Sequence, residues 1–325
     1  MKLTRSVRHN IIANFTGNVW RGIFNLAFIP VYIKLMGVEV YGLLGVFMSL
    51  SALFILLDMG LSTTLSRELS RLSVIENSEQ ESRNLVRTFE VVYWLIGIVI
   101  GASVIILAPL IAKYWINSAN ISTEIIEQTL LIMGMLLAFQ WPRAIYIGGL
   151  EGLQRQVLYN VIKTLSMLAR HIGAVLILTF ISPSILYFFY WQSVIALITT
   201  IVLAVYLWRS LPKSNGRSKF DKNLFIKNWK FVSGVMGISL GTVLLTQIDK
   251  VILSKMLTLE VFSYYMLATT VATVIMSLVS PIHTALFPRL SQLVVKKDET
   301  GISDLYHRGC QLASIIILPI SITMI

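Results

Sequence analysis

NIIANFTGNVWRGIFNLAFIPVYIKLM, the stretch from Asn10 to Met36, decides the fold because it is apolar enough to cross a membrane yet carries a line of polar residues. Four of these recur at intervals of four, three and four positions, which places them on one face of a helix. They are Asn14, Asn18, Arg21 and Asn25. Arg21 lies roughly 20 Å along such a helix from the basic residues before it, near the middle of a bilayer. A charge at that depth costs about 2.5–3.5 kcal/mol on insertion scales, so the stripe must face other helices or a water-filled cavity.

The composition is that of an integral membrane protein. The chain has 325 residues, of which 56% are hydrophobic and only 13% charged, and its mean hydropathy is +0.76. Soluble domains are less apolar and more highly charged. The net charge of +11 would suggest a nucleic-acid partner in a soluble chain, but here the basic residues flank apolar runs, so no nucleic acid is expected. The single cysteine, Cys310, excludes an internal disulfide and a thiolate metal cluster within the chain.

Eight complete apolar runs are each long enough to cross a bilayer as a helix. They cover residues 10–36, 42–66, 86–112, 125–149, 157–181, 184–208, 231–255 and 260–286. A ninth run begins near Leu305 and continues to Ile325. The sequence therefore predicts an all-α, polytopic membrane protein.

The distribution of basic residues predicts a multi-pass protein of the plasma (inner) membrane with a cytoplasmic N-terminus. With the N-terminus inside, 20 of the 27 Lys and Arg residues fall in cytoplasmic segments and 4 at external ends. The remaining three, Arg21, Lys163 and Arg170, lie within spans. This asymmetry follows the rule that cytoplasmic segments are rich in Lys and Arg. The most basic loop, 209–230, is expected to contact anionic lipid headgroups.

An internal repeat appears when the chain is shifted by 221 residues without a gap. Residues 35–41, LMGVEVY, then align with residues 256–262, MLTLEVF, and residues 69–72, LSRL, align with residues 290–293, LSQL. One offset held across two spans and two loops indicates a duplication. The first unit holds six spans, an even number, so the two copies are parallel. Two such units would need about 440 residues.

Short motifs in a fixed order point to a family. They are GVEVYG at 37–42, LDMGL at 57–61 followed by REL at 67–69, QIDK at 247–250 and PRLS at 288–291. In order and spacing they resemble the polysaccharide flippases of the O-antigen (Wzx-like) type, within the multidrug/oligosaccharidyl-lipid/polysaccharide exporter superfamily. The resemblance covers essentially the whole chain.

The resemblance implies a MATE-like two-bundle transporter fold of parallel six-helix repeats. The first bundle is expected at 1–208, a basic cytoplasmic linker at 209–230, and the first three helices of the second bundle at 231–325. The second bundle is thus expected to be truncated by about three helices. The resemblance also implies export of an undecaprenyl-pyrophosphate-linked oligosaccharide by alternating access, as in lipopolysaccharide biosynthesis.

The fifth span carries a second polar face, on which Asn160, Lys163 and Arg170 recur at helical spacing. Together with Arg21, the two cations of this face make the interior net positive. Such an interior suits an anionic substrate, a lipid-linked pyrophosphate or an acidic sugar, because arginine binds phosphate and carboxylate groups bidentately. The alternative for Lys163 is that it reaches the cytoplasmic surface, about 9 Å away by helical rise, and binds no substrate.

Asp58 and His171 are candidates for coupling to an ion gradient. Asp58 lies roughly 12 Å inside the cytoplasmic end of its span, where a carboxylate can bind a proton or a sodium ion, or pair with Arg21. Its Asp-x-Gly setting equally suits a side chain that bonds to the backbone where the helix loosens at Gly60. His171 titrates near neutral pH and can carry a proton, and the alternative is a hydrogen-bonded structural histidine.

The remaining aromatic and ligating residues indicate few other sites. Most of the seven tryptophans lie near span ends, as in an interfacial belt, whereas Trp20 and Trp191 lie within spans, where stacking on sugar rings is the alternative. The histidines outside the fifth span are scattered among different segments and do not form a metal site. No Gly-rich phosphate-binding loop is present, so neither a cofactor nor an ATPase activity is expected. Energy would then come from ion or substrate gradients.

Three functions compete at this point. The leading one is a flippase that binds an anionic substrate in the cationic interior. A multidrug or organic-cation antiporter of the same superfamily would have an acidic, aromatic cavity, which three interior cations against one well-buried acid disfavour. A membrane glycan polymerase or glycosyltransferase would carry a sizeable external loop with acidic or histidine residues, and the external loops here are short.

Overall fold

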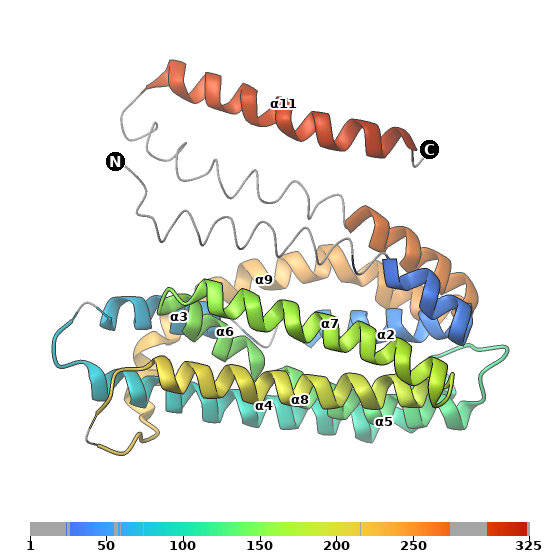
Figure 1. Ribbon diagram of the computed structural model, residues 1–325, viewed down its shortest axis with the longest axis horizontal. Coiled ribbons are helices and arrows are strands. Elements are labelled where there is room, and N and C mark those ends of the chain that lie inside the picture. The colour runs from blue at the N-terminus through green and yellow to red at the C-terminus, as the bar shows by residue number, and fades with distance from the viewer. Residues whose placement is uncertain are drawn as a thin grey trace. The chain divides into compact units, whose positions relative to one another are not determined.

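The computed structural model describes residues 24, 27–54, 58, 60–73, 75–214, 216–273 and 298–323. These residues form helices and loops, with no β-strand among them (Figure 1). The helices are α2 (Val38–Phe54), α3 (Leu61–Leu72), α4 (Glu79–Tyr114), α5 (Thr123–Gln140), α6 (Arg143–Gly152), α7 (Gln156–Phe180), α8 (Ile185–Ser210), α9 (Lys222–Met256) and α11 (Glu299–Thr323). Residues 27–36 and 259–273 are also helical. The prediction of an all-α protein is confirmed.

Four helical segments of the described chain are long and apolar enough to cross a membrane. They are Glu79–Tyr114, Thr123–Gly152, Gln156–Phe180 and Ile185–Ser210. These segments coincide with the third to sixth runs predicted from hydropathy, and they show a polytopic membrane protein. Most of the first run lies outside the described residues.

The chain divides into two compact units, which are described separately. One comprises residues 31–266 and the other residues 1–30 with 267–325. In the larger unit, α5 packs against α4 and α8, and α8 packs in turn against α6 and α7 (Figure 1). All contacts discussed below belong to this larger unit.

Two of the predicted spans are broken. The run 42–66 is not one helix, because Gly60 lies outside the helical conformation and α3 begins after it, at Leu61. Gly60 caps the start of α3 with a φ of 74°, a left-handed conformation that glycine adopts without steric cost. The run 125–149 is divided between α5 and α6 at Trp141 and Pro142. Proline lacks the N–H that would continue the helical hydrogen bonds, which accounts for the division at this point.

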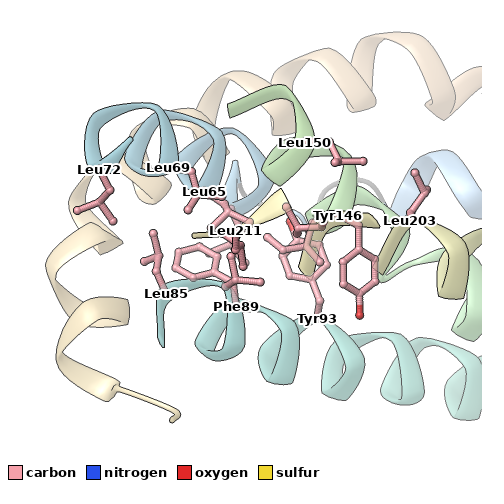
Figure 2. Packing of buried hydrophobic residues seen from close by; sticks show 14 of the residues in the cluster. Leu65, Leu69, Leu72, Leu85, Phe89, Tyr93, Tyr146, Leu150, Leu203 and Leu211 are labelled. Carbon is pink, nitrogen blue, oxygen red and sulfur yellow. The ribbon is translucent and has the colours of Figure 1, made fainter. Parts of the chain in front are cut away.

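A buried apolar cluster joins α3, α4, α6 and α8. Figure 2 shows Phe89 of α4 next to Leu65 of α3 and Tyr93 of α4 beside Tyr146 of α6, and all three aromatic side chains are almost completely buried. Lipid tails are as apolar as these side chains, so helices in a membrane are held by close packing and hydrogen bonds more than by transfer out of lipid. The cluster therefore supplies a rigid frame for the polar groups beside it.

A second close contact joins the start of α2 to the helix at 259–273, and we call it the glycine junction. At Gly42 an added Cβ would lie 2.5 Å from the backbone oxygen of Leu259, and at Gly45 it would lie 2.5 Å from Cγ of Met266. The hydroxyl of Ser263 donates to the carbonyl of Val38 over 2.7 Å. Under the 221-residue repeat, position 42 corresponds to 263 and position 45 to 266. Each glycine thus contacts its own repeat mate.

Candidate functional site

A pocket of about 340 Å³, which we call the polar pocket for the polar side chains in its otherwise apolar wall, lies in the larger unit beside α3 and the division between α5 and α6. Its lining residues are Ser51, Asp58, Ser62, Leu137, Gln140, Trp141, Arg143, Ala144 and Ile147. The break before α3 and the one between α5 and α6 interrupt apolar runs, and polar side chains in a membrane gather where they are shielded from lipid. The pocket combines a carboxylate, a guanidinium, an amide, two hydroxyls and an indole.

Close packing of α6 on α3 brings the two breaks together. At Gly152 an added Cβ would lie 2.5 Å from the backbone oxygen of Ser66, and Gly148 is equally close to the backbone of Ser62. The hydroxyl of Ser70 donates to the carbonyl of Gly152 over 2.8 Å. Small residues let helix backbones approach in this way, so larger side chains here would push Arg143 away from Asp58.

Asp58 accepts hydrogen bonds from two side chains. The hydroxyl of Tyr93 donates to Oδ1, and the hydroxyl of Ser62 donates to Oδ2 over 2.9 Å. The sequence interpretation offered a bond to the backbone near Gly60, and no such bond occurs among the described residues. Tyr93, fixed in the buried cluster shown in Figure 2, thus holds Asp58 at the pocket wall.

Two polar groups of the pocket residues have no hydrogen-bond partner within the described part of the chain. They are the hydroxyl of Ser51 and the indole N–H of Trp141, both shielded from solvent. The ring of Trp141 stacks on that of Tyr93 with a centroid distance of 6.2 Å and an interplanar angle of 25°. An unpaired buried polar group costs about 1–3 kcal/mol, so the pocket wall contains groups that a bound molecule would stabilise.

Arg143 was missed as a site residue by sequence reasoning, which assigned it to a cytoplasmic segment. In the structure it begins α6 and lines the pocket, and its charge acts on that of Arg170 in α7. The signal in the sequence was an arginine directly after Pro142 and inside an apolar run. A proline frees backbone groups, and polar or charged residues in a membrane gather near such breaks.

The helix α7 carries all the candidates of the fifth span, but their surroundings differ. Arg170 interacts electrostatically with Arg143 and Tyr32, whereas Lys163 interacts with Glu151. The ammonium group of Lys163 also lies 5.2 Å from the ring centre of Tyr159. The charge of Arg143 thus acts on Arg170, whereas the charge of Lys163 acts on Glu151.

Two further candidates on α7, Asn160 and His171, are described by the structure. Asn160 is buried, with 6% of its surface exposed. Nδ1 of His171 is hydrogen-bonded to the hydroxyl of Tyr32 at 2.8 Å, which links α7 to the helix at 27–36. This bond agrees with the alternative interpretation of His171 as a hydrogen-bonded structural histidine. Four candidates lie outside the described residues, and they are Asn14, Asn18, Arg21 and Asn25.

A second buried acid, Glu90 of α4, was also missed. Its carboxylate accepts hydrogen bonds from the hydroxyl of Tyr146 at 2.8 Å and the indole N–H of Trp208 at 3.1 Å, and it pairs with Arg87 at 2.8 Å. The acid within the run 86–112 was the available signal. Because all these partners are protein groups, Glu90 ties α4, α6 and α8 together and contrasts with the pocket residues that lack partners.

Comparisons with known proteins agree with this architecture. No curated protein matches the chain significantly. Among solved structures, the MATE multidrug transporter DinF-BH matches with a TM-score of 0.64 and 14% sequence identity, covering 98% of this chain and 72% of that one. The likeness confirms the predicted MATE-like transporter fold. A family model described as "Polysaccharide biosynthesis protein" matches residues 7–294. The chain therefore belongs to the polysaccharide biosynthesis protein family, a family of membrane exporters and flippases with a MATE-like fold.

Proposed function

We propose that the protein is a flippase that moves an undecaprenyl-pyrophosphate-linked oligosaccharide from the cytoplasmic to the outer leaflet of the cell membrane. Its N-terminus lies in the cytoplasm, and the basic loop 209–230 rests on anionic lipid headgroups. The substrate binds between opposed helical bundles, at 1–208 and from 231 onward, that open alternately to either side. The protein moves its substrate without changing it chemically, and is not an enzyme.

One observation carries the proposal. The guanidinium group of Arg143 lines the pocket, and its charge acts on that of a second buried arginine, Arg170. Charged side chains inside a membrane protein are rare and usually mark a substrate path. A pyrophosphate suits this path, because each guanidinium presents two parallel N–H donors to phosphate oxygens. Lys163, Asn160 and the polar face of the first span, with Arg21, extend this path.

An ion gradient supplies the energy. Asp58 at the pocket wall and His171 beside Tyr32 are the groups that take up the coupling proton, and Asp58 is also suited to a sodium ion. Coupling through Asp58 is supported by its position, since it shares the pocket with Arg143 and both would respond to the same bound anion.

The second candidate is a multidrug antiporter, which the fold of the multidrug transporter DinF-BH favours. The charges in and near the pocket disfavour this candidate. An organic cation would be repelled by Arg143 and Arg170, and Asp58 already accepts two hydrogen bonds. Testing the same protein with both substrate types separates the two candidates.

The test uses the full chain in proteoliposomes that contain a fluorescent undecaprenyl-pyrophosphate-linked oligosaccharide in the inner leaflet. We expect wild type to move it, and Arg170→Ala and Arg21→Ala to lose at least about tenfold in rate, since charged hydrogen bonds contribute about 1.5–3 kcal/mol each. In cells, the same variants should lose surface glycan at unchanged protein abundance. The matched control is Arg155→Ala, an exposed arginine directly before α7. Normal export by both variants, or transport of an organic cation instead, would contradict the proposal.

A further inference from the structure

The pocket holds more polar groups than an anion site requires. A phosphate needs donors, which Arg143 supplies, but the wall also presents the acceptor Asp58 and the amide of Gln140, which both donates and accepts. The indole N–H of Trp141 and the hydroxyl of Ser51 add groups that lack a partner within the described residues. Donors and acceptors are thus mixed around one space.

Charge narrows the choice of ligand. Asp58 and Arg143 line the same pocket and carry opposite charges, so the site is close to neutral. Within the pocket, Asp58 offsets the attraction of Arg143 for an anion, and Arg143 offsets the attraction of Asp58 for a cation. An indole N–H only donates and cannot bind a metal ion or a proton. The ligand that fits a neutral wall of mixed donors and acceptors is a neutral molecule with several hydroxyl groups.

The volume of the pocket and its aromatic side chain narrow the choice of ligand further. A volume of about 340 Å³ is near the lower end of small-molecule pockets, which span about 300–1,000 Å³. One sugar ring fits such a space, and a longer oligosaccharide does not. The ring of Trp141, which stacks on Tyr93, adds an aromatic surface at the edge of the pocket.

We propose that this pocket is a subsite for one neutral sugar ring of the transported glycan, which rests on the proposed flippase function. Ring hydroxyls donate to Asp58 and Gln140 and accept from Arg143. A rotation of the Ser51 side chain and a small shift of the Trp141 ring bring their unpaired groups to the sugar. The arginine pair with Arg170 then holds the pyrophosphate, and the pocket selects the glycan. Specificity for the sugar depends on the pocket side chains of α2, α5 and α6.

The experiment measures binding of free probes to the purified full chain. Saturation-transfer NMR is recorded with glucose, galactose and N-acetylglucosamine in turn, and inorganic pyrophosphate is titrated separately by calorimetry. Trp141→Phe keeps a ring but removes the N–H, and Ser51→Ala removes the hydroxyl on another helix. Trp208→Phe is the matched control, because its N–H bonds to Glu90 outside the pocket.

We expect at least one sugar to bind wild type, and both pocket variants to weaken it about fivefold or more, the effect of a lost hydrogen bond. Trp208→Phe should bind sugar like wild type, and pyrophosphate binding should be weakened by Arg170→Ala but not by Trp141→Phe. If pyrophosphate binds but no sugar does, or if both pocket variants bind sugar normally, the subsite is wrong while the flippase stands. Sodium binding that depends on Asp58, without sugar binding, would equally overturn the subsite. A wild type that binds neither probe and moves no lipid-linked oligosaccharide would refute the proposed function itself.

Discussion

The glycine junction and the polar pocket lie in the same helical unit but are built in opposite ways. At the junction the backbones touch, and Ser263, which is fully buried, bonds to the carbonyls of Val38 and Leu259. In the pocket the helices are interrupted, and polar groups of Ser51 and Trp141 lack partners within the described chain. Buried polar groups that are hydrogen-bonded stabilise a contact, whereas buried polar groups without a partner lower the stability of the protein. The comparison indicates that the junction holds helices together and that the pocket is kept for a ligand.

The strongest way to break the junction is to add one carbon atom. Gly42→Ala places a Cβ against the backbone oxygen of Leu259, which cannot move aside like a flexible side chain. We expect a loss of about 1–3 kcal/mol in the free energy of unfolding, seen as a lower midpoint of thermal unfolding of the purified protein. Gly241→Ala is the matched control, because nothing lies within 4 Å of the added Cβ, and alanine favours the helix. Equal midpoints for the two variants would show that the junction is not tightly packed.

A pair of serine substitutions sharpens the contrast between the regions. Ser263→Ala removes the hydrogen bond to Val38 and should cost about 0.5–1.5 kcal/mol of stability. Ser51→Ala removes a buried hydroxyl that has no partner among the described residues, so it should leave the unfolding midpoint unchanged or raise it slightly. Thermal unfolding without any added sugar checks both. If Ser51→Ala lowers the unfolding midpoint more than Ser263→Ala does, the pocket is packed like a core and does not differ from the junction.

The smallest effect expected is a pH dependence next to the junction, at the start of α2. Glu39, ahead of the apolar run, is buried, which raises its pKa, but hydrogen bonds from Ser118 and Asn120 to its carboxylate outweigh this and hold the pKa below its ordinary value. The stabilisation is therefore complete above the unfolded pKa of about 4.5 and is lost as the pH falls through the lower, folded pKa. Unfolding midpoints measured from about pH 7 to about pH 3 should show this loss in wild type. In Glu39→Gln the unfolding midpoint should depend less on pH in this range. If the dependence is unchanged, Glu39 is not its cause.

Sequence reasoning identified the spans well where the signal was composition along the chain. The runs 86–112, 157–181 and 184–208 correspond to α4, α7 and α8 because a helix in lipid needs a continuous apolar stretch. It failed at 42–66, where hydropathy stayed high through a break that depends on the backbone of Gly60. An average over many residues does not detect a single left-handed residue.

The candidate site was predicted only in part. Arg170 was singled out by its depth in an apolar run, whereas Arg143, whose charge acts on that of Arg170, had been assigned to a cytoplasmic segment. The carboxylate of Asp58 was recognised as unusual, but its partner Tyr93 lies 35 residues away on another helix. Aromatic residues are common in apolar runs, so nothing in the sequence separates Tyr93 from those that only pack.

By itself the sequence determined that this is a helical membrane protein with intramembrane charges and a duplicated architecture, because hydropathy, charge and repeats are properties of the linear order. Only the tertiary structure decided which positions meet. It paired Gly42 with Ser263 and Gly45 with Met266, and it gathered residues of α2, α3, α5 and α6 around one pocket. The physical reason is that contacts between helices depend on small residues, breaks and side-chain shape at single positions, which no average along the chain contains.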